Sequence, residues 1–222
     1  MTVDFDHAWP VSPPEAVLAA LGRLGAGARV ATDADNTLWS GDVGDELVRL
    51  AGSPPFAPWQ PGQVDLDGYL LAMETDYAEG CRYAARILRH VAPADVVPVL
   101  DEALRQRVRP RRWLIEALRA AMARGVQVTI VSASPRLTVQ RGALLYGLAQ
   151  CEIIAVDTHS DAVVEPAPVG NGKVQAWQRR GLPPPDLALG DSRWDLPLLR
   201  SARVGLLLER ACDDPRCDHA VV

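Results

Sequence analysis

Along most of this chain, short apolar runs alternate with segments whose hydrophobic residues recur at helical spacing. The first such segment predicts a helix from about Pro13 to the glycines at 25 and 27. The expected buried face of this helix consists of Val17, Leu18, Leu21 and Leu24. The apolar runs predict five strands, at residues 29–32, 126–131, 151–156, 187–189 and 204–208. Because helices separate these strands, we expect an α/β protein with a parallel sheet and a ligand site at the carboxyl ends of the strands.

The stretch between Thr37 and Ser132 is far longer than one crossover helix requires. Its patterns predict helices at 43–51, from 67 to about 91 and from 93 to about 108, with a proline-rich loop at 53–62. A further helix, 110–124, starts with a proline and should pack back on the sheet. We therefore predict a core domain of residues 1–41 and 109–222. A helical cap, residues 42–108, would be inserted after the first strand and cover the site.

Chemically reactive side chains follow three of the predicted strands. Asp33 and Asp35 come directly after the first strand, Ser132 after the second and Asp191 after the fourth. The carboxyl ends of parallel strands meet at one edge of a sheet, so these side chains should lie close together. Charge at this edge usually indicates ligand binding or catalysis.

Lysine is used once in the chain. All but one of the 23 basic residues are arginine, and the exception is Lys173. A compact ammonium in a chain that otherwise uses guanidinium groups predicts a position that needs a point charge. The alternative is an exposed lysine that starts a helix by chance.

The composition excludes several classes of function. A net charge of −5 argues against a nucleic-acid surface. No apolar run approaches the roughly 20 residues that span a bilayer, and the first six residues are acidic where a secretory leader would be basic. The four cysteines are scattered, as expected for reduced thiols. We expect a cytoplasmic protein with no nucleic-acid or membrane partner, and a homo-oligomer is compatible with this composition.

The C-terminal tail contains Cys212, Cys217 and His219 and therefore admits a zinc site. The spacing of these residues matches no closed structural site, and no fourth ligand is evident. A mobile terminus is the favoured interpretation.

Four motifs in order, Asp33-x-Asp35-x-Thr37, Ser132, Lys173 and residues 190–195, resemble those of the haloacid dehalogenase-like superfamily. Residues 42–52, the Ser-Ala-Ser-Pro motif and the helical insert are most similar to the phosphoserine-phosphatase-like branch. The resemblance covers residues 28–208. It implies a Rossmann-like parallel sheet with an inserted helical cap.

The resemblance also implies catalytic roles. Asp33 would be the nucleophile that forms an aspartyl-phosphate, and Asp35 would act as general acid and then as base. Two carboxylates would repel an anionic substrate, and Mg²⁺ answers that problem. Its implied ligands are the Asp33 carboxylate, the Asp35 backbone carbonyl and Asp191. Asp195 is placed to order metal-bound water or Lys173.

The substrate-binding residues follow in the same way. Ser132 and the backbone N–H of Ala133 are expected at the phosphoryl oxygens, with Lys173 as a cation that touches both phosphate and nucleophile. Asp42 occupies the place where phosphoserine phosphatases have an acidic residue for the substrate ammonium. Thr37 is grouped with these residues, the alternative being that its hydroxyl holds the loop after the strand.

Together these features predict a Mg²⁺-dependent phosphatase of a small phosphorylated metabolite. A phosphomutase or another phosphotransferase would share every catalytic residue, and a non-catalytic binding protein would have lost some of them.

The leaving-group site departs from the phosphoserine pattern. The cap arginine expected for a substrate carboxylate has three candidates, Arg82, Arg86 and Arg89, none of which aligns cleanly. An apolar lid for a different leaving group could come from three aromatic residues, with core packing as the alternative: Phe56, Trp59 and Trp194.

Overall fold

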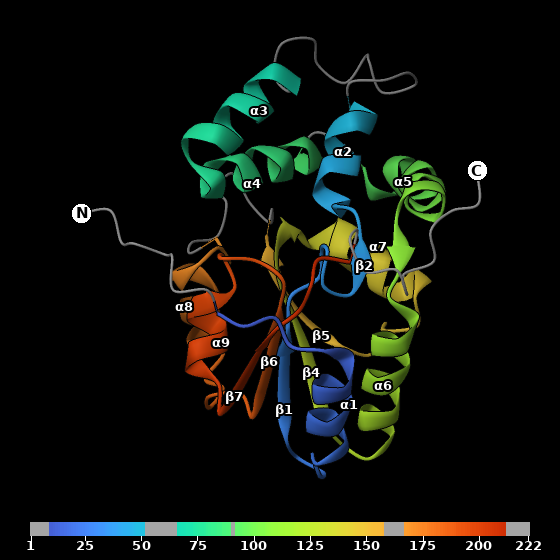
Figure 1. Cartoon of the computed structure of the whole chain (residues 1–222). Coiled ribbons are helices and arrows are strands. Elements are labelled where there is room, and N and C mark those ends of the chain that lie inside the picture. Colours follow the sequence, from blue (N-terminus) through green and yellow to red (C-terminus); the bar gives the residue numbers. More distant parts are fainter. Residues whose placement is uncertain (1–8, 52–65, 90–91, 158–166, 212–222) are drawn as a thin grey trace.

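The computed structural model describes residues 9–51, 66–89, 92–157 and 167–211. Five strands form one parallel sheet in the order β5-β4-β1-β6-β7 (Figure 1). These strands are β1 (Arg29–Thr32), β4 (Gln127–Pro135), β5 (Glu152–Val156), β6 (Leu187–Gly190) and β7 (Val204–Leu207). The predicted α/β class with a parallel sheet is therefore confirmed. β4 is longer than expected, and its pairing with β5 changes register between Val131 and Pro135.

Helices cover both faces of the sheet because successive strand residues point to opposite sides. Val30 belongs to a core cluster with residues of α1 (Pro14–Gly22), α6 (Arg112–Ala123) and α7 (Arg136–Leu145). Its neighbour Ala31 belongs to a second cluster with residues of α8 (Asn171–Arg179) and α9 (Leu196–Ser201). The strands are thus buried on both faces, which leaves their carboxyl ends as the place where polar side chains can gather.

One residue of the first predicted helix was assigned to the wrong face. Val17 and Leu21 are buried and Leu24 packs against them, but Leu18 is 44% exposed. At about 100° per residue, Leu21 lies about 40° from Val17 around the helix axis, whereas Leu18 lies about 100° from Val17 and so falls outside the buried face.

The helices between residues 40 and 109, the cap helices, lie beyond the carboxyl edge of the sheet (Figure 1). They are α2 (Val43–Ala51), α3 (Leu66–Thr75), α4 (Tyr77–Arg86), a short 3₁₀ turn (Ile87–Arg89) and α5 (Pro93–Arg107). The helices predicted at 43–51 and 93–108 are confirmed. The numerical bounds of the core and cap domains stay a prediction.

The prediction of a single helix from 67 to about 91 is wrong, because one helix ends before Asp76 and another begins after it. The Asp76 carboxylate accepts hydrogen bonds from the backbone N–H groups of Ala78 and Glu79 at 3.0 and 3.2 Å, and so starts a new helix. The two helices then pack tightly, since a Cβ added to Gly80 would stand 2.4 Å from the sulfur of Met73. The break sets two helices side by side above the sheet.

A two-stranded antiparallel ribbon connects the cap helices to the core. It pairs β2 (Trp39–Ser40) with β3 (Arg109–Pro110). Strands of two residues leave no periodic signal, so the sequence did not predict the ribbon. The described parts of the chain contain no helix with the length and apolar character needed to cross a membrane.

Candidate active site

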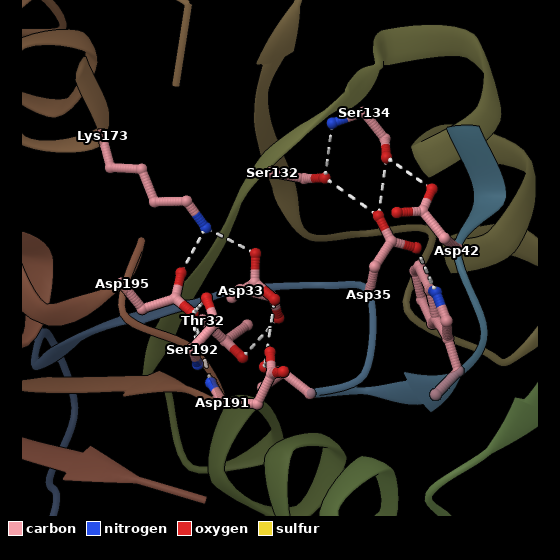
Figure 2. Close-up of polar contacts among 12 residues, drawn as sticks. Thr32, Asp33, Asp35, Asp42, Ser132, Ser134, Lys173, Asp191, Ser192 and Asp195 are labelled. Carbon is pink, nitrogen blue, oxygen red and sulfur yellow. Dashed lines mark hydrogen bonds and ion pairs between the residues drawn. The ribbon is translucent and has the colours of Figure 1, made fainter. Parts of the chain in front are cut away.

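The carboxyl ends of β1, β4 and β6 face a cavity of about 360 Å³ beneath the cap helices. Asp33, Asp35, Lys173, Asp191 and Asp195 all line it. The sequence predicted that these residues would gather at this edge, and the structure brings them together (Figure 2). Their catalytic roles stay a prediction.

Lys173 lies at the centre of this group and not on the surface, where the chance alternative would place it. Its side chain is 2% exposed, and its Nζ donates to Asp33 Oδ1 at 2.5 Å and to Asp195 Oδ1 at 2.6 Å. Burial alone would lower the pKa of Lys173, but Asp195 and Asp33 raise it above the usual lysine range. The ammonium is therefore charged at neutral pH.

Asp195 holds both the lysine and the loop that carries Asp191. While Oδ1 binds Lys173, Oδ2 accepts from the Ser192 hydroxyl at 2.7 Å and from the Ser192 and Asp191 N–H groups at 3.0 and 3.2 Å. Asp195 packs so close to Gly190 that a Cβ there would stand 2.4 Å from the Asp195 Cβ. Asp195 is thus in contact with Lys173, and its predicted role in ordering the lysine or metal-bound water stays a prediction.

The Thr37 hydroxyl lies between the carboxylates of Asp33 and Asp191. It lies 3.0 Å from Asp33 Oδ2 and 2.9 Å from Asp191 Oδ1, and its single hydrogen serves one of them at a time. The side chain is fully buried and is not among the residues that line the cavity. This location supports the structural alternative for Thr37 over substrate binding.

The carboxylates of Asp33, Asp191 and Asp195 form a cluster with ligand atoms within 4.8 Å of one another. Burial and the charge of Asp195 raise the pKa of Asp33 well above its ordinary value. The same two causes raise the pKa of Asp191 to about 6, although Arg210 Nε lies 3.7 Å from Asp191 Oδ2. Three buried carboxylates against one buried ammonium leave an excess of negative charge. A hard cation such as Mg²⁺ would offset it, so this donor set fits the ion.

Asp35 points away from that cluster. Its Oδ1 accepts from the Trp39 indole N–H at 2.8 Å and from the backbone N–H of Val43 at 2.9 Å. Its Oδ2 accepts from the Ser134 hydroxyl at 2.7 Å (Figure 2). Burial raises the pKa of Asp35, and these three donors oppose that rise. The carboxylate is thus absent from the metal cluster, which leaves to Asp35 only the predicted backbone contribution.

The Ser-Ala-Ser segment lies at the carboxyl end of β4. Ala133 and Ser134 line the cavity, whereas Ser132 is 1% exposed, does not line it and accepts the Ser134 N–H at 3.1 Å. The Ser132 hydroxyl reaches Asp35 only at 3.5 Å. Ser134 is therefore a site residue that the sequence interpretation missed. The signal available for it was its place as the second serine of the Ser-Ala-Ser-Pro motif.

Asp42 lines the cavity but also starts α2. Its Oδ1 accepts from the N–H groups of Gly44 and Asp45 at 2.7 and 3.0 Å. Burial, followed by the charges of Asp35 and Asp45, raises the pKa of Asp42 well above its ordinary value. The helix start thus uses one oxygen of the carboxylate that was predicted to read a substrate ammonium.

The roof of the cavity comes from α3 and α4. The sequence predicted a helical cap over the site, but not which of its residues would line the cavity. The roof residues are Tyr69, Met73, Tyr77, Cys81 and Ala84. No signal in the sequence marked them, since their role depends on how the cap docks on the core.

Two of the three cap arginine candidates bind a carboxylate of their own helix. Arg82 pairs with Glu79 at 3.3 Å and Arg86 pairs with the same carboxylate, and neither lines the cavity. Several other predicted features lie outside the described residues: Phe56, Trp59, the Arg89 side chain and the tail with Cys212, Cys217 and His219.

Comparisons with known proteins agree with this fold and identify the family. Residues 30–200 match the family described as haloacid dehalogenase-like hydrolase, whereas no curated protein matches significantly.

Several solved structures share the fold. A Bordetella pertussis Tohama I protein described as of unknown function has a TM-score of 0.60 at 18% identity, covering 78% of this chain and 86% of its own. A phosphoserine phosphohydrolase-like protein from Francisella tularensis has a TM-score of 0.54 at 17% identity, covering 80% and 84%. A HAD family hydrolase from Salmonella enterica serovar Typhi has a TM-score of 0.53 at 21% identity, covering 84% and 63%.

Proposed function

Because the chain belongs to the haloacid dehalogenase-like hydrolases, we propose that it is a Mg²⁺-dependent phosphatase that hydrolyses a small phosphomonoester through an aspartyl-phosphate. One observation carries this proposal. The buried ammonium of Lys173 lies between Asp33 and Asp195, at the floor of a cavity that also holds Asp191. Such a cluster has no use in packing, and its charges suit the binding of a phosphoryl group and a cation.

The cation would be held by the Asp33 carboxylate, by Asp191 and by the backbone carbonyl of Asp35. When bound, it supplies positive charge that neutralises the phosphoryl oxygens. Asp195 supports this site by fixing the N–H of Asp191 and the hydroxyl of Ser192.

In the first step, a carboxylate oxygen of Asp33 attacks phosphorus, and the bond between phosphorus and the ester oxygen breaks. The proton that the leaving oxygen needs comes from the carboxyl group of Asp35. Burial raises the pKa of Asp35, which favours the protonated acid. Lys173 remains charged beside Asp33 and stabilises the negative charge of the phosphoryl group.

In the second step, Asp35 acts as base. It takes a proton from a water molecule whose oxygen attacks phosphorus, and the acyl phosphate bond to Asp33 breaks. Inorganic phosphate leaves, the Asp33 carboxylate is restored and Asp35 is again protonated. Water is the acceptor in this proposal, which distinguishes the phosphatase from a phosphotransferase.

The proposed substrate is a small phosphorylated metabolite, and the proposed location is the cytoplasm. The cavity of about 360 Å³ supports a small substrate, since it lies at the lower end of the range for small-molecule sites. The net charge of −5 supports the absence of a nucleic-acid partner.

The test uses p-nitrophenyl phosphate and ³²P-labelled acetyl phosphate. The wild-type protein should release phosphate only with Mg²⁺, and acid quenching should trap label on the protein. Asp33→Asn should trap no label and show no turnover, because the amide cannot form an acyl phosphate. Label on Asp33→Asn, or full activity in metal-free buffer, would overturn the proposal.

A further inference from the structure

Among the described residues that line the cavity, those from α3 and α4 carry no ionised side chain. From α3 and α4 come the phenol rings of Tyr69 and Tyr77, the thioether of Met73, the thiol of Cys81 and the methyl group of Ala84. Burial raises the pKa of the Cys81 thiol, so this group is neutral as well. The roof therefore offers apolar surface and neutral polar groups to a substrate.

Tyr77 and Trp194 form an aromatic wall between the cap and the core. Their rings stack with centroids 4.9 Å apart and planes 7° apart, and both residues line the cavity. Tyr77 begins α4, and Trp194 belongs to the loop between Asp191 and Asp195. The stacked pair thus presents aromatic carbon atoms to the cavity, and such surface suits an apolar part of a substrate.

The cations that line the cavity all belong to the core. Lys173 is held between two carboxylates, Arg210 lies beside Asp191, and the Arg193 guanidinium stands 4.7 Å over the Trp194 ring. Arg193 and Arg210 are exposed at the rim.

The cap adds no cation to this set among the described residues that line the cavity. Arg82 and Arg86 bind Glu79 instead. The sequence of residues 52–65 contains neither lysine nor arginine. A second anionic group on the substrate would thus meet no cation among the described residues of the roof.

The polar groups of the roof offer little to such an anion. The Tyr69 hydroxyl donates its one hydrogen to Asp45 at 2.5 Å, so it has no donor left for a substrate carboxylate. Asp42, which also lines the cavity, is an acidic residue and offers no cation.

Resting on the proposed phosphatase function, we propose that the substrate is the phosphate monoester of an uncharged apolar alcohol with a ring-sized body, bound against Tyr77, Trp194 and Met73. A leaving group with a carboxylate or a second phosphate is excluded.

The experiment compares alkyl monoesters with similar chemistry, namely benzyl phosphate, ethyl phosphate, phosphoglycolate and O-phosphoserine, each with Mg²⁺. Benzyl phosphate should exceed ethyl phosphate in kcat/KM by about tenfold or more, because the ring fills an apolar pocket. It should exceed the two carboxylate substrates by about 100-fold, because like charges close together are strongly disfavoured.

Two variants test the named residues. Tyr77→Leu should lower the ratio of benzyl to ethyl phosphate activity by about tenfold, since it removes one ring of the wall. Met73→Lys places an ammonium at the roof and should raise the relative activity on phosphoglycolate by about tenfold. The matched control is Leu71→Lys, which adds the same charge to the same helix at a position that is 62% exposed and does not line the cavity. It should leave the substrate ranking unchanged.

Activity on p-nitrophenyl phosphate distinguishes failure of the proposed phosphatase function from failure of the leaving-group inference. If neither this ester nor any alkyl ester is hydrolysed, the proposed function fails and this inference fails with it. If it is hydrolysed while phosphoglycolate or phosphoserine matches or exceeds benzyl phosphate, only the leaving-group inference is overturned. An unchanged ratio in Tyr77→Leu, or equal effects of Met73→Lys and Leu71→Lys, would also overturn it.

Discussion

The hydroxyl of Ser134 lies 2.7 Å from Oδ2 of Asp35 and donates a hydrogen bond to it across 99 residues of sequence. The partner oxygen of the same carboxylate is held by Trp39 and Val43. Ser134 therefore completes a set of donors that fixes the orientation of the proposed general acid, and it does so from the end of a neighbouring strand.

Ser134→Ala should lower kcat on alkyl phosphates by about tenfold, since a hydrogen bond to a charged group contributes about 1.5 kcal/mol or more. The loss on p-nitrophenyl phosphate should be smaller, because that leaving group needs little proton transfer. Steady-state kinetics on both substrates measure the difference. Ser201→Ala, which removes a hydroxyl bonded to the Leu198 carbonyl in α9, serves as the control. An equal loss on both substrates would show that Ser134 does not act through Asp35.

Asp35→Asn should impair alkyl phosphates far more than aryl phosphates in the first step, because the amide cannot supply a proton to a poor leaving group. Single-turnover measurements with acid quenching follow the formation of the phosphorylated protein. With aryl substrates the labelled protein should accumulate, since the base for the second step is also lost. Equal losses on aryl and alkyl substrates would contradict the acid role.

Lys173→Arg should reduce kcat/KM by about 100-fold or more, comparable to the loss of one donor that stabilises a transition-state charge. The charge is kept, but a planar guanidinium does not fit a site that is 2% exposed and bounded by Asp33 and Asp195 at 2.5 and 2.6 Å. Arg180→Lys, the reverse exchange at the end of the same helix, should have normal activity. Thermal unfolding checks that both variants fold. Near-normal turnover of Lys173→Arg would remove Lys173 from the catalytic set.

Removal of divalent cations with a chelator should abolish activity, and Mg²⁺ should restore it. Asp191→Asn should raise the Mg²⁺ concentration needed for half-maximal activity by about 100-fold or more. Removal of a group that only supports a metal ligand already costs about 10–100-fold in metal affinity, and Asp191 is a proposed ligand itself. Arg210→Gln, which removes the cation 3.7 Å from Asp191, should lower that concentration. Titration of activity with Mg²⁺ measures both shifts. Wild-type metal dependence in Asp191→Asn would place the cation elsewhere.

The parts of this protein that the sequence predicted are those with local signals. Asp33 and Asp191 stand at strand ends that hydrophobic patterns identify, and the topology of a parallel sheet brings those ends together. Lys173 stands out in a different way, as the one lysine of the chain. The boundary between α3 and α4 was missed because the apolar spacing continues through Asp76. The second helix starts there because the Asp76 carboxylate accepts hydrogen bonds from the N–H groups of Ala78 and Glu79.

The cavity roof was missed for a different reason. Tyr69, Met73 and Tyr77 acquire their position through the packing of α3 and α4 over the core, which is a long-range property. Thr37 and Ser132 illustrate a third case. The motif places both residues beside the site, but their burial depends on the atoms around them and leaves no local signal. The Thr37 hydroxyl contacts Asp33 and Asp191, and the substrate-binding roles of Thr37 and Ser132 stay predictions.

The hold on Asp35 Oδ1 has a mechanical consequence. Trp39 lies in the ribbon through which the chain enters the cap, and Val43 is the first residue of α2. The orientation of the proposed acid is therefore set by the short segment that leads from β1 into α2. A substitution that shifts this segment would also turn the Asp35 carboxylate, even if it changed no residue that lines the cavity.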